Sequence, residues 1–137
     1  MMREILFRGK RVDNGEWVEG DVHKNIDFSK AHIHPNGERV RSFDVLPETV
    51  GQYTGLVDKN DRKIFEGDIC RFKRFNDIYI GKIVFNVTTA SFVMWYQPIV
   101  GAYGEKATQK MLLSVCDDIE VIGNIHDNPE ILNNPSP

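Results

Sequence analysis

The chain has 137 residues, of which 41% are hydrophobic and 27% are charged, a balance typical of a soluble globular protein of one or two small domains. Its formal net charge of −3 argues against a dedicated duplex-binding protein, because such proteins carry a clear basic excess. No apolar run approaches the roughly 18 residues of a membrane-spanning helix, and the N-terminus lacks the apolar core of a signal peptide, so we expect a cytoplasmic protein.

Turn signals divide the first half of the chain into three predicted β-hairpins. Residues 13–15 (DNG) and 35–37 (PNG) each end in Asn-Gly, a pair that accepts positive φ at little cost and favours a tight hairpin turn. Residues 58–61 (DKND) separate two further strand-like segments, and Asp and Asn stabilise such turns by bonding their own backbone.

The second half predicts further strands. Four segments rich in Ile, Val and aromatic residues follow one another and are bounded by Gly, Asn, Asp or Pro: 68–75, 77–86, 90–100 and 117–126. Their number and short spacing favour a small barrel or sandwich. In the second segment apolar residues alternate on both faces, so we expect that strand to be covered on both sides.

Two segments have helical features. Residues 104–115 have a helix-forming composition, and Ala107, Met111, Leu112 and Val115 suit one helix face, although an edge strand is the competing interpretation. Residues 127–132 predict a last helical turn, with Asn128 as its cap and Pro129 at its first position. We expect an N-terminal part of residues 1–48 and a C-terminal part of residues 49–137.

The acidic stretch from Asp58 to Asp68 is interpreted as structural. Counted from Asp58, the positions that an EF-hand fills with Gly and Glu hold Lys63 and Ile69, which excludes that calcium motif. Gly67 permits a sharp bend, and the Asp68 carboxylate can accept backbone N–H groups across it. The two cysteines, Cys70 and Cys116, form no C-x-x-C pair and are expected to be small buried hydrophobic residues.

His32 and His34 are the weak candidates for a metal site. They share one face if their segment is a strand, and further ligands would have to come from His23 or Asp27. Two solvated histidines beside a turn are the favoured interpretation, so we expect no metal and no cofactor. The sequence has neither G-x-S-x-G nor H-E-x-x-H, and we therefore predict that the protein is not an enzyme.

The segment 70–82 interleaves basic and aromatic side chains, which are the ingredients of a groove for single-stranded nucleic acid. The residues concerned are Arg71, Lys73, Arg74 and Lys82 with Phe75 and Tyr79. An ordinary amphipathic strand with a solvated basic face is the favoured interpretation, and nucleic-acid binding is the alternative.

Two long phrases, FDVLPETVGQYTGLVDKNDRKIFEGDIC and DIEVIGNIHDNPEIL, together with the opening REILFRGKRVDNGEWVEGDV, resemble the YopX family of phage and prophage proteins. The matching motif residues are Gly51, Tyr53, Gly55, Gly67, Asp68, Gly123, Asn124, Asn128 and Pro129. Relatives often have Gly where this chain has Asp61, so we expect a looser loop there.

The resemblance implies a mainly β protein (α+β by strict count), with a small N-terminal α+β or hairpin part and a C-terminal SH3-like β-barrel. It carries no established activity and no catalytic residues. We therefore expect a phage or prophage accessory protein in the host cytoplasm that acts by binding, with an unknown host or phage protein as its partner and a homo-oligomer as a further option. Single-stranded nucleic acid is the alternative partner.

Overall fold

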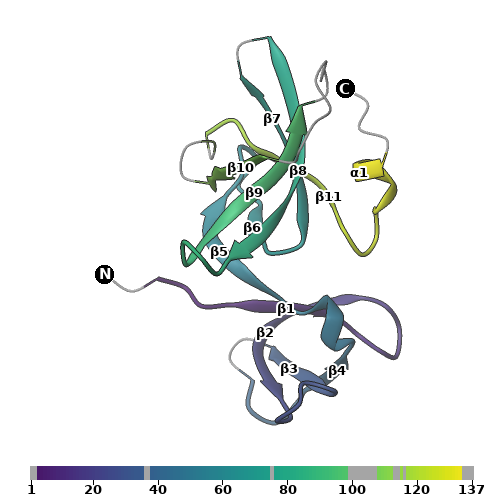
Figure 1. Cartoon of the computed structure of the whole chain (residues 1–137). Coiled ribbons are helices and arrows are strands. Elements are labelled where there is room, and N and C mark those ends of the chain that lie inside the picture. Colours follow the sequence, from purple (N-terminus) through teal and green to yellow (C-terminus); the bar gives the residue numbers. More distant parts are fainter. Residues whose placement is uncertain are drawn as a thin grey trace. The chain divides into compact units, whose positions relative to one another are not determined.

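The computed structural model describes residues 3–35, 38–74, 76–98, 108–112, 115 and 117–133 (Figure 1). Its strands are β1 (Phe7–Lys10), β2 (Trp17–Lys24), β3 (Ala31–Pro35), β4 (Phe43–Val45), β5 (Gly51–Val57), β6 (Lys63–Phe65), β7 (Asp68–Arg74), β8 (Asp77–Asn86), β9 (Ser91–Pro98), β10 (Thr108–Met111) and β11 (Glu120–Asn124). A 3₁₀ turn, η1 (Pro47–Thr49), and a short helix, α1 (Glu130–Asn133), complete the list.

The predicted mainly β fold is confirmed. One sheet has the order β4-β3-β2-β1-β5-β6 and the other has the order β10-β9-β8-β7-β11. From β4 to β5 in the first sheet and throughout the second, neighbouring strands are antiparallel. Strand pairing in the described ranges closes neither sheet into a barrel. None of the helices formed by these ranges is long and apolar enough to cross a membrane.

The chain divides into two compact units, Met1–Gly55 and Leu56–Pro137. The division falls inside β5, so that its first residues belong to the N-terminal unit and its last two to the C-terminal unit, where β6 follows. The boundary predicted from the sequence, between residues 48 and 49, stays a prediction.

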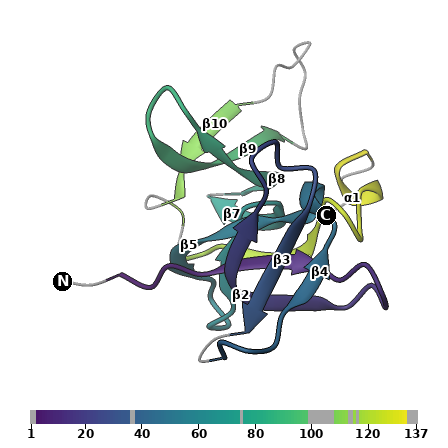
Figure 2. The ribbon, with the colours of Figure 1, turned by 90° about the horizontal axis from the view of Figure 1, so that it is seen from below.

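The N-terminal unit is a curled sheet around a small apolar core. Figure 2 shows β2, β3 and β4 side by side, and a bridge between Arg11 and Val45 links the continuation of β1 back to β4. Ala31, Ile33 and Val45 are buried on the inner face. The hairpin predicted at residues 13–15 is confirmed, with Gly15 at φ +74°. At the second predicted turn β3 and β4 are antiparallel, and residues 36 and 37 lie outside the described ranges.

The C-terminal unit contains the four predicted strands as β7, β8, β9 and β11. One face of their sheet forms the main core, which includes Cys70, Phe72, Ile83, Met94 and Val121. Burial of Cys70 agrees with the sequence prediction, whereas Cys116 lies outside the described residues.

The opposite face of β8 is mixed, because Ile78, Ile80 and Val84 alternate there with Lys82. Ile80 is 5% exposed there although it points away from Ile83, which is fully buried in the main core. The helix α1 contacts β8. At Ile80 the strand is therefore covered on both sides, as the sequence predicts, whereas Lys73 and Trp95 on the same face of the sheet are exposed.

The helix predicted at residues 104–115 is wrong for the part that the structure describes. Residues 108–111 form β10, in which Thr108 pairs with Tyr96 and Met111 with Val93 on β9. Helix propensity is a weak preference that strand pairing overrides, and the competing edge-strand interpretation holds here. Residues 104–107, 113 and 114 are not described.

The N-terminal α part is not found among the described residues, which contain only the turn η1 there. The last helical turn predicted near the C-terminus is present as α1, in which the N–H groups of Ile131 and Leu132 donate to the carbonyls of Asn128 and Pro129. The side chain of Asn128 turns instead toward Asn124, where its Oδ1 accepts the backbone N–H at 3.2 Å.

Candidate functional site

The loop between β5 and β6 is held by Asp58, whose residue surface is only 4% exposed. One carboxylate oxygen accepts the backbone N–H groups of Asn60 and Arg62 at 2.8 and 2.9 Å, and the other accepts that of Val121 on β11 at 2.9 Å. Burial acts to raise the pKa of Asp58, but the three hydrogen bonds together outweigh it and the pKa lies below its usual value. With its carboxylate committed to backbone donors, Asp58 is a structural anchor.

The expectation of a looser loop at Asp61 is wrong. Asp61 adopts φ +63°, the left-handed conformation for which glycine is best suited. Its N–H donates to the carbonyl of Asp58 at 3.0 Å, and the N–H of Asp58 donates to the carbonyl of Arg62 at 2.8 Å. The aspartate therefore fits the tight turn, because Asp and Asn tolerate this conformation better than other residues with a side chain.

The Gly67-Asp68 corner is likewise structural. Gly67 has φ +92°. Its N–H donates to the carbonyl of Ile83, and its carbonyl accepts the N–H of Ile125. Asp68 is only 2% exposed, and its carboxylate accepts the backbone N–H of Phe65 at 2.7 Å. The two buried carboxylates of the acidic stretch, those of Asp58 and Asp68, therefore bind the backbone of their own chain.

The second family-like segment, DIEVIGNIHDNPEIL, is likewise held by hydrogen bonds between a side chain and the backbone of the same segment. Asn124 Oδ1 accepts the N–H groups of His126 and Asp127 at 2.9 and 2.8 Å. A Cβ on Gly123 would lie 2.6 Å from Asn128 Oδ1, so only glycine fits beside that side chain. Gly51 and Tyr53 are buried at the start of β5, and Gly55 has φ +91°.

A hollow of about 220 Å³ lies beside β7 and the start of β11, and charged side chains form most of its lining. Its lining residues are Lys59, Arg71, Phe72, Lys73, Ile78, Asp118 and Glu120. Strand pairing brings several of them together, because Arg71 on β7 lies opposite Glu120 on β11 and Lys73 on β7 lies opposite Ile78 on β8. Lys59 reaches the hollow from the loop that Asp58 anchors.

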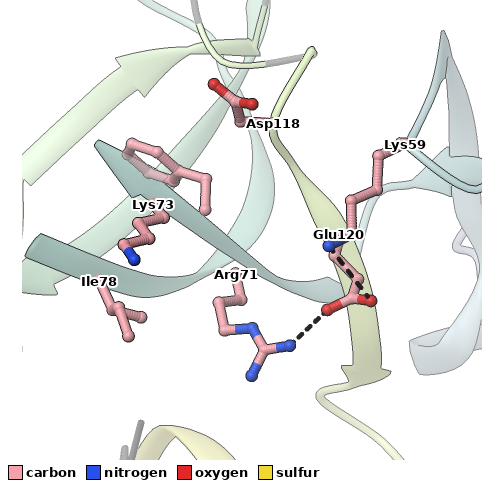
Figure 3. Close-up of a pocket in the computed structure, with 7 residues that line it drawn as sticks. Lys59, Arg71, Lys73, Ile78, Asp118 and Glu120 are labelled. Atoms are coloured by element: carbon pink, nitrogen blue, oxygen red, sulfur yellow. Dashed lines mark hydrogen bonds and ion pairs between the residues drawn. The ribbon is translucent and has the colours of Figure 1, made fainter. Parts of the chain in front are cut away.

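Part of this charge is already paired. Figure 3 shows Glu120 joined to two cations: Arg71 Nη2 lies 2.5 Å from Glu120 Oε1, and Lys59 Nζ lies 3.8 Å from Oε2. The hydrogen bond from Arg71 lowers the pKa of Glu120. The side chains of Lys73 and Asp118 are exposed and make no hydrogen bond or ion pair with another described residue. The hollow therefore presents one cation and one carboxylate to a ligand.

The predicted nucleic-acid residues are divided between two faces. The register puts Arg71, Lys73 and Lys82 on one face of the sheet. Tyr79 lies on the other, where its ring centroid is 4.9 Å from that of Phe72 and 5.0 Å from that of Tyr96, within the core. Arg74 ends β7 but its side chain is not described, and Phe75 lies outside the described residues.

Four side chains that accompany these cations were not predicted from the sequence. Trp95 lies opposite Lys82 on the basic face and is 36% exposed. The two family-like segments contain the other three, Lys59, Asp118 and Glu120. Membership of these segments is the signal in the sequence that could have identified them. Their approach to Arg71 depends on the pairing of β7 with β11, and no local pattern reveals that register.

The structure brings together the histidines that the sequence left as metal candidates. His23 on β2 lies directly opposite His32, and His34 follows on the same face of β3. Asp27 does not join them, because its carboxylate accepts the N–H of Ser29 within the β2–β3 turn at 3.0 Å. No three His, Cys, Asp or Glu side chains in the described ranges already have the geometry of a metal site.

Comparisons with known proteins agree with the resemblance. A profile of the YopX protein family matches residues 6–133. The crystal structure of protein EF1440 from Enterococcus faecalis is similar, with 24% sequence identity, a TM-score of 0.52, and coverage of 96% of this chain and 99% of that chain. At this identity the likeness shows the fold alone. A search of curated proteins found no match.

Proposed function

The chain belongs to the YopX protein family, and on this premise we propose that it is a non-enzymatic accessory protein, of phage or prophage origin and working in the host cytoplasm, that acts by binding another protein. Asp58 and Asp68 are buried and their carboxylates accept backbone N–H groups, in agreement with the structural role expected for the acidic stretch. This leaves the exposed charges of the hollow as the chemistry available to a partner.

The observation that carries the proposal is the pair of exposed, oppositely charged side chains in this hollow, Lys73 and Asp118, around the half-buried Ile78. A partner fits when it offers a carboxylate to Lys73, a cation to Asp118 and an apolar side chain to Ile78. Two charges of opposite sign fix the orientation and register of a bound segment, and the apolar contact adds burial. The Arg71–Glu120 pair forms a fixed wall of the hollow.

The finer fold that the resemblance implies belongs to the same proposal. Short antiparallel strands entered through the Gly67-Asp68 corner support an SH3-like arrangement of the C-terminal unit. A second copy of the chain also satisfies the required chemistry, since the hollow carries both signs of charge. Light scattering over a range of concentrations distinguishes self-association from capture of a different protein.

Affinity capture with the full chain tests the proposal. Wild type, Lys73→Glu and Lys30→Glu serve as baits in a bacterial host lysate, and the captured protein is then purified and titrated into each. Lys30 is an exposed lysine of the N-terminal unit, so its variant reproduces the charge change away from the hollow. We expect Lys73→Glu to weaken binding at least about tenfold and Lys30→Glu to change it less than about twofold. Equal affinities for the two variants would contradict the proposal.

Single-stranded nucleic acid is the second candidate partner, and Trp95 is the observation that favours it. This ring is 36% exposed opposite Lys82, on the face that also carries Arg71 and Lys73, so a base can stack beside phosphate-binding cations. A titration of the Trp17→Phe variant with single-stranded oligonucleotide, followed by the fluorescence of Trp95 at several salt concentrations, tests it. Log affinity must fall linearly with log salt, and a flat slope or an absence of binding at low salt would remove this candidate.

A further inference from the structure

One face of the N-terminal sheet gathers three of the four histidines in the chain. His32 and His34 are two residues apart on β3, and His23 lies directly opposite His32 on β2. Side chains on a strand alternate between faces and directly paired residues share one, so all three imidazoles stand on the same side. The apolar core of this unit, with Ile33, lies on the other side.

The three rings are close enough to share a small ligand. Their centroids are 5.3 Å apart for His23 and His32, 5.0 Å for His23 and His34, and 5.3 Å for His32 and His34. Three imidazoles bound to one tetrahedral ion, each with a metal–nitrogen distance of about 2.0–2.1 Å, require centroids about 5 Å apart. The separation of the rings therefore suits a single metal ion.

His34 adds a second, independent observation. Its Nδ1 atom is buried, and within the described part of the chain no hydrogen-bond partner lies within reach. A buried polar atom without a partner costs free energy, and a bound ion is one of the ways in which a native protein satisfies such an atom. The lone pair of an imidazole nitrogen is a good ligand for a divalent transition metal.

Carboxylates flank the three rings on the same face. Asp21 pairs with His34 across β2 and β3, and Asp44 pairs with His32 across β3 and β4. Both aspartates are exposed. A carboxylate here can take the fourth coordination position or accept the second N–H of a ligating imidazole, and in either case it offsets the charge of a bound cation.

We propose that His23, His32 and His34 form a three-imidazole site for a divalent transition metal of the Zn²⁺, Ni²⁺ and Cu²⁺ group. In the free protein the rings of His23 and His32 are nearly parallel, with 9° between their planes, so binding requires one ring to turn. His23 is the exposed member and turns into another rotamer without disturbing the core. The site is in the N-terminal unit and is independent of the proposed protein-binding hollow.

Calorimetric titration of the metal-stripped full chain with ZnCl₂ tests this site. Separate variants replace each cluster histidine by alanine, and His126→Ala, which removes the fourth histidine of the chain from the other unit, is the matched control. We expect one Zn²⁺ per wild-type chain, at least about tenfold weaker binding for each cluster variant and unchanged binding for His126→Ala. The visible spectrum of added Co²⁺ then reports imidazole coordination directly.

Two results would overturn the metal site. One is a wild type that shows no saturable binding of Zn²⁺ or Co²⁺, and the other is an equal loss in His126→Ala and in the cluster variants. Circular dichroism shows whether each variant is folded. Should His34→Ala fail to fold, His23→Ala carries the test, because the His23 side chain is exposed and its removal leaves the packing in place.

Discussion

Replacing Asp58 by Asn removes the charge of the carboxylate that anchors the β5–β6 loop while keeping its shape. In wild type one oxygen accepts the N–H groups of Asn60 and Arg62, and the other accepts that of Val121. An amide retains one oxygen, so the best orientation keeps the two local bonds and turns the NH₂ group toward Val121. Two donors then face each other across a buried contact that was 2.9 Å long.

The cost follows from that single lost bond. A hydrogen bond to a charged acceptor contributes about 1.5–3 kcal/mol, and the buried N–H of Val121, left without an acceptor, adds about 1–3 kcal/mol of desolvation that overlaps with this loss. We therefore expect Asp58→Asn to lower the free energy of unfolding of the C-terminal unit by about 2–4 kcal/mol. Asp61→Asn, in the same loop but exposed, makes the same charge change and should cost less than about 0.5 kcal/mol.

Urea unfolding measures this difference with one signal for each unit. The chain has two tryptophans, Trp17 in the N-terminal unit and Trp95 in the C-terminal unit. A Trp17→Phe background leaves Trp95 as the reporter of the C-terminal unit, and both Asp variants are compared in it. A cost for Asp58→Asn within about 0.5 kcal/mol of that for Asp61→Asn would refute the anchoring role.

The same comparison has a definite pH dependence. The pKa of Asp58 in the folded chain lies below the ordinary value of 3.8, so the folded state stabilises the charged carboxylate. Its contribution is complete above the unfolded pKa and is lost as the pH falls through the folded pKa. The stability difference between wild type and Asp58→Asn should therefore be constant near neutral pH and should shrink below about pH 4. A difference that grew on acidification would contradict the sign.

Two further variants test other parts of the account. Gly123→Ala should lower the free energy of unfolding in urea by about 1–3 kcal/mol, because the new Cβ would lie 2.6 Å from Asn128 Oδ1. The double variant with Asn128→Ala should lose less stability than the sum of the two single variants. Additive losses would refute that contact. Arg71→Ala should raise the pKa of Glu120 in an NMR titration, because the hydrogen bond from Arg71 lowers that pKa in wild type. Lys30→Ala, in the other unit, should leave the pKa of Glu120 unchanged. A pKa of Glu120 that did not rise in Arg71→Ala would refute the pairing.

Local chemistry made the strands and turns predictable. Asn-Gly at residues 14 and 15 and the apolar alternation of β8 describe structure formed within a few residues, and both are seen. The helix predicted at residues 104–115 failed where it is described because β10 is defined by its pairing with β9. Such a partner is distant in sequence, so a composition that favours helix could not reveal it.

The candidate site was less predictable for the same reason. Alternation along β7 correctly separates Arg71 from Phe72, but it says nothing of Glu120, which is 49 residues away and meets Arg71 only through strand pairing. Tyr79 was taken as a groove residue because it lies near cations in sequence. The pleat of β8 turns it instead toward Phe72.

The most direct test of the central claim is titration of the captured partner protein into wild type, Lys73→Glu and Lys30→Glu. If the hollow beside β7 is the binding surface, the partner should bind Lys73→Glu at least about tenfold more weakly than wild type and Lys30→Glu with nearly wild-type affinity. Wild-type affinity for Lys73→Glu, or an equal loss in both variants, would contradict binding at this surface.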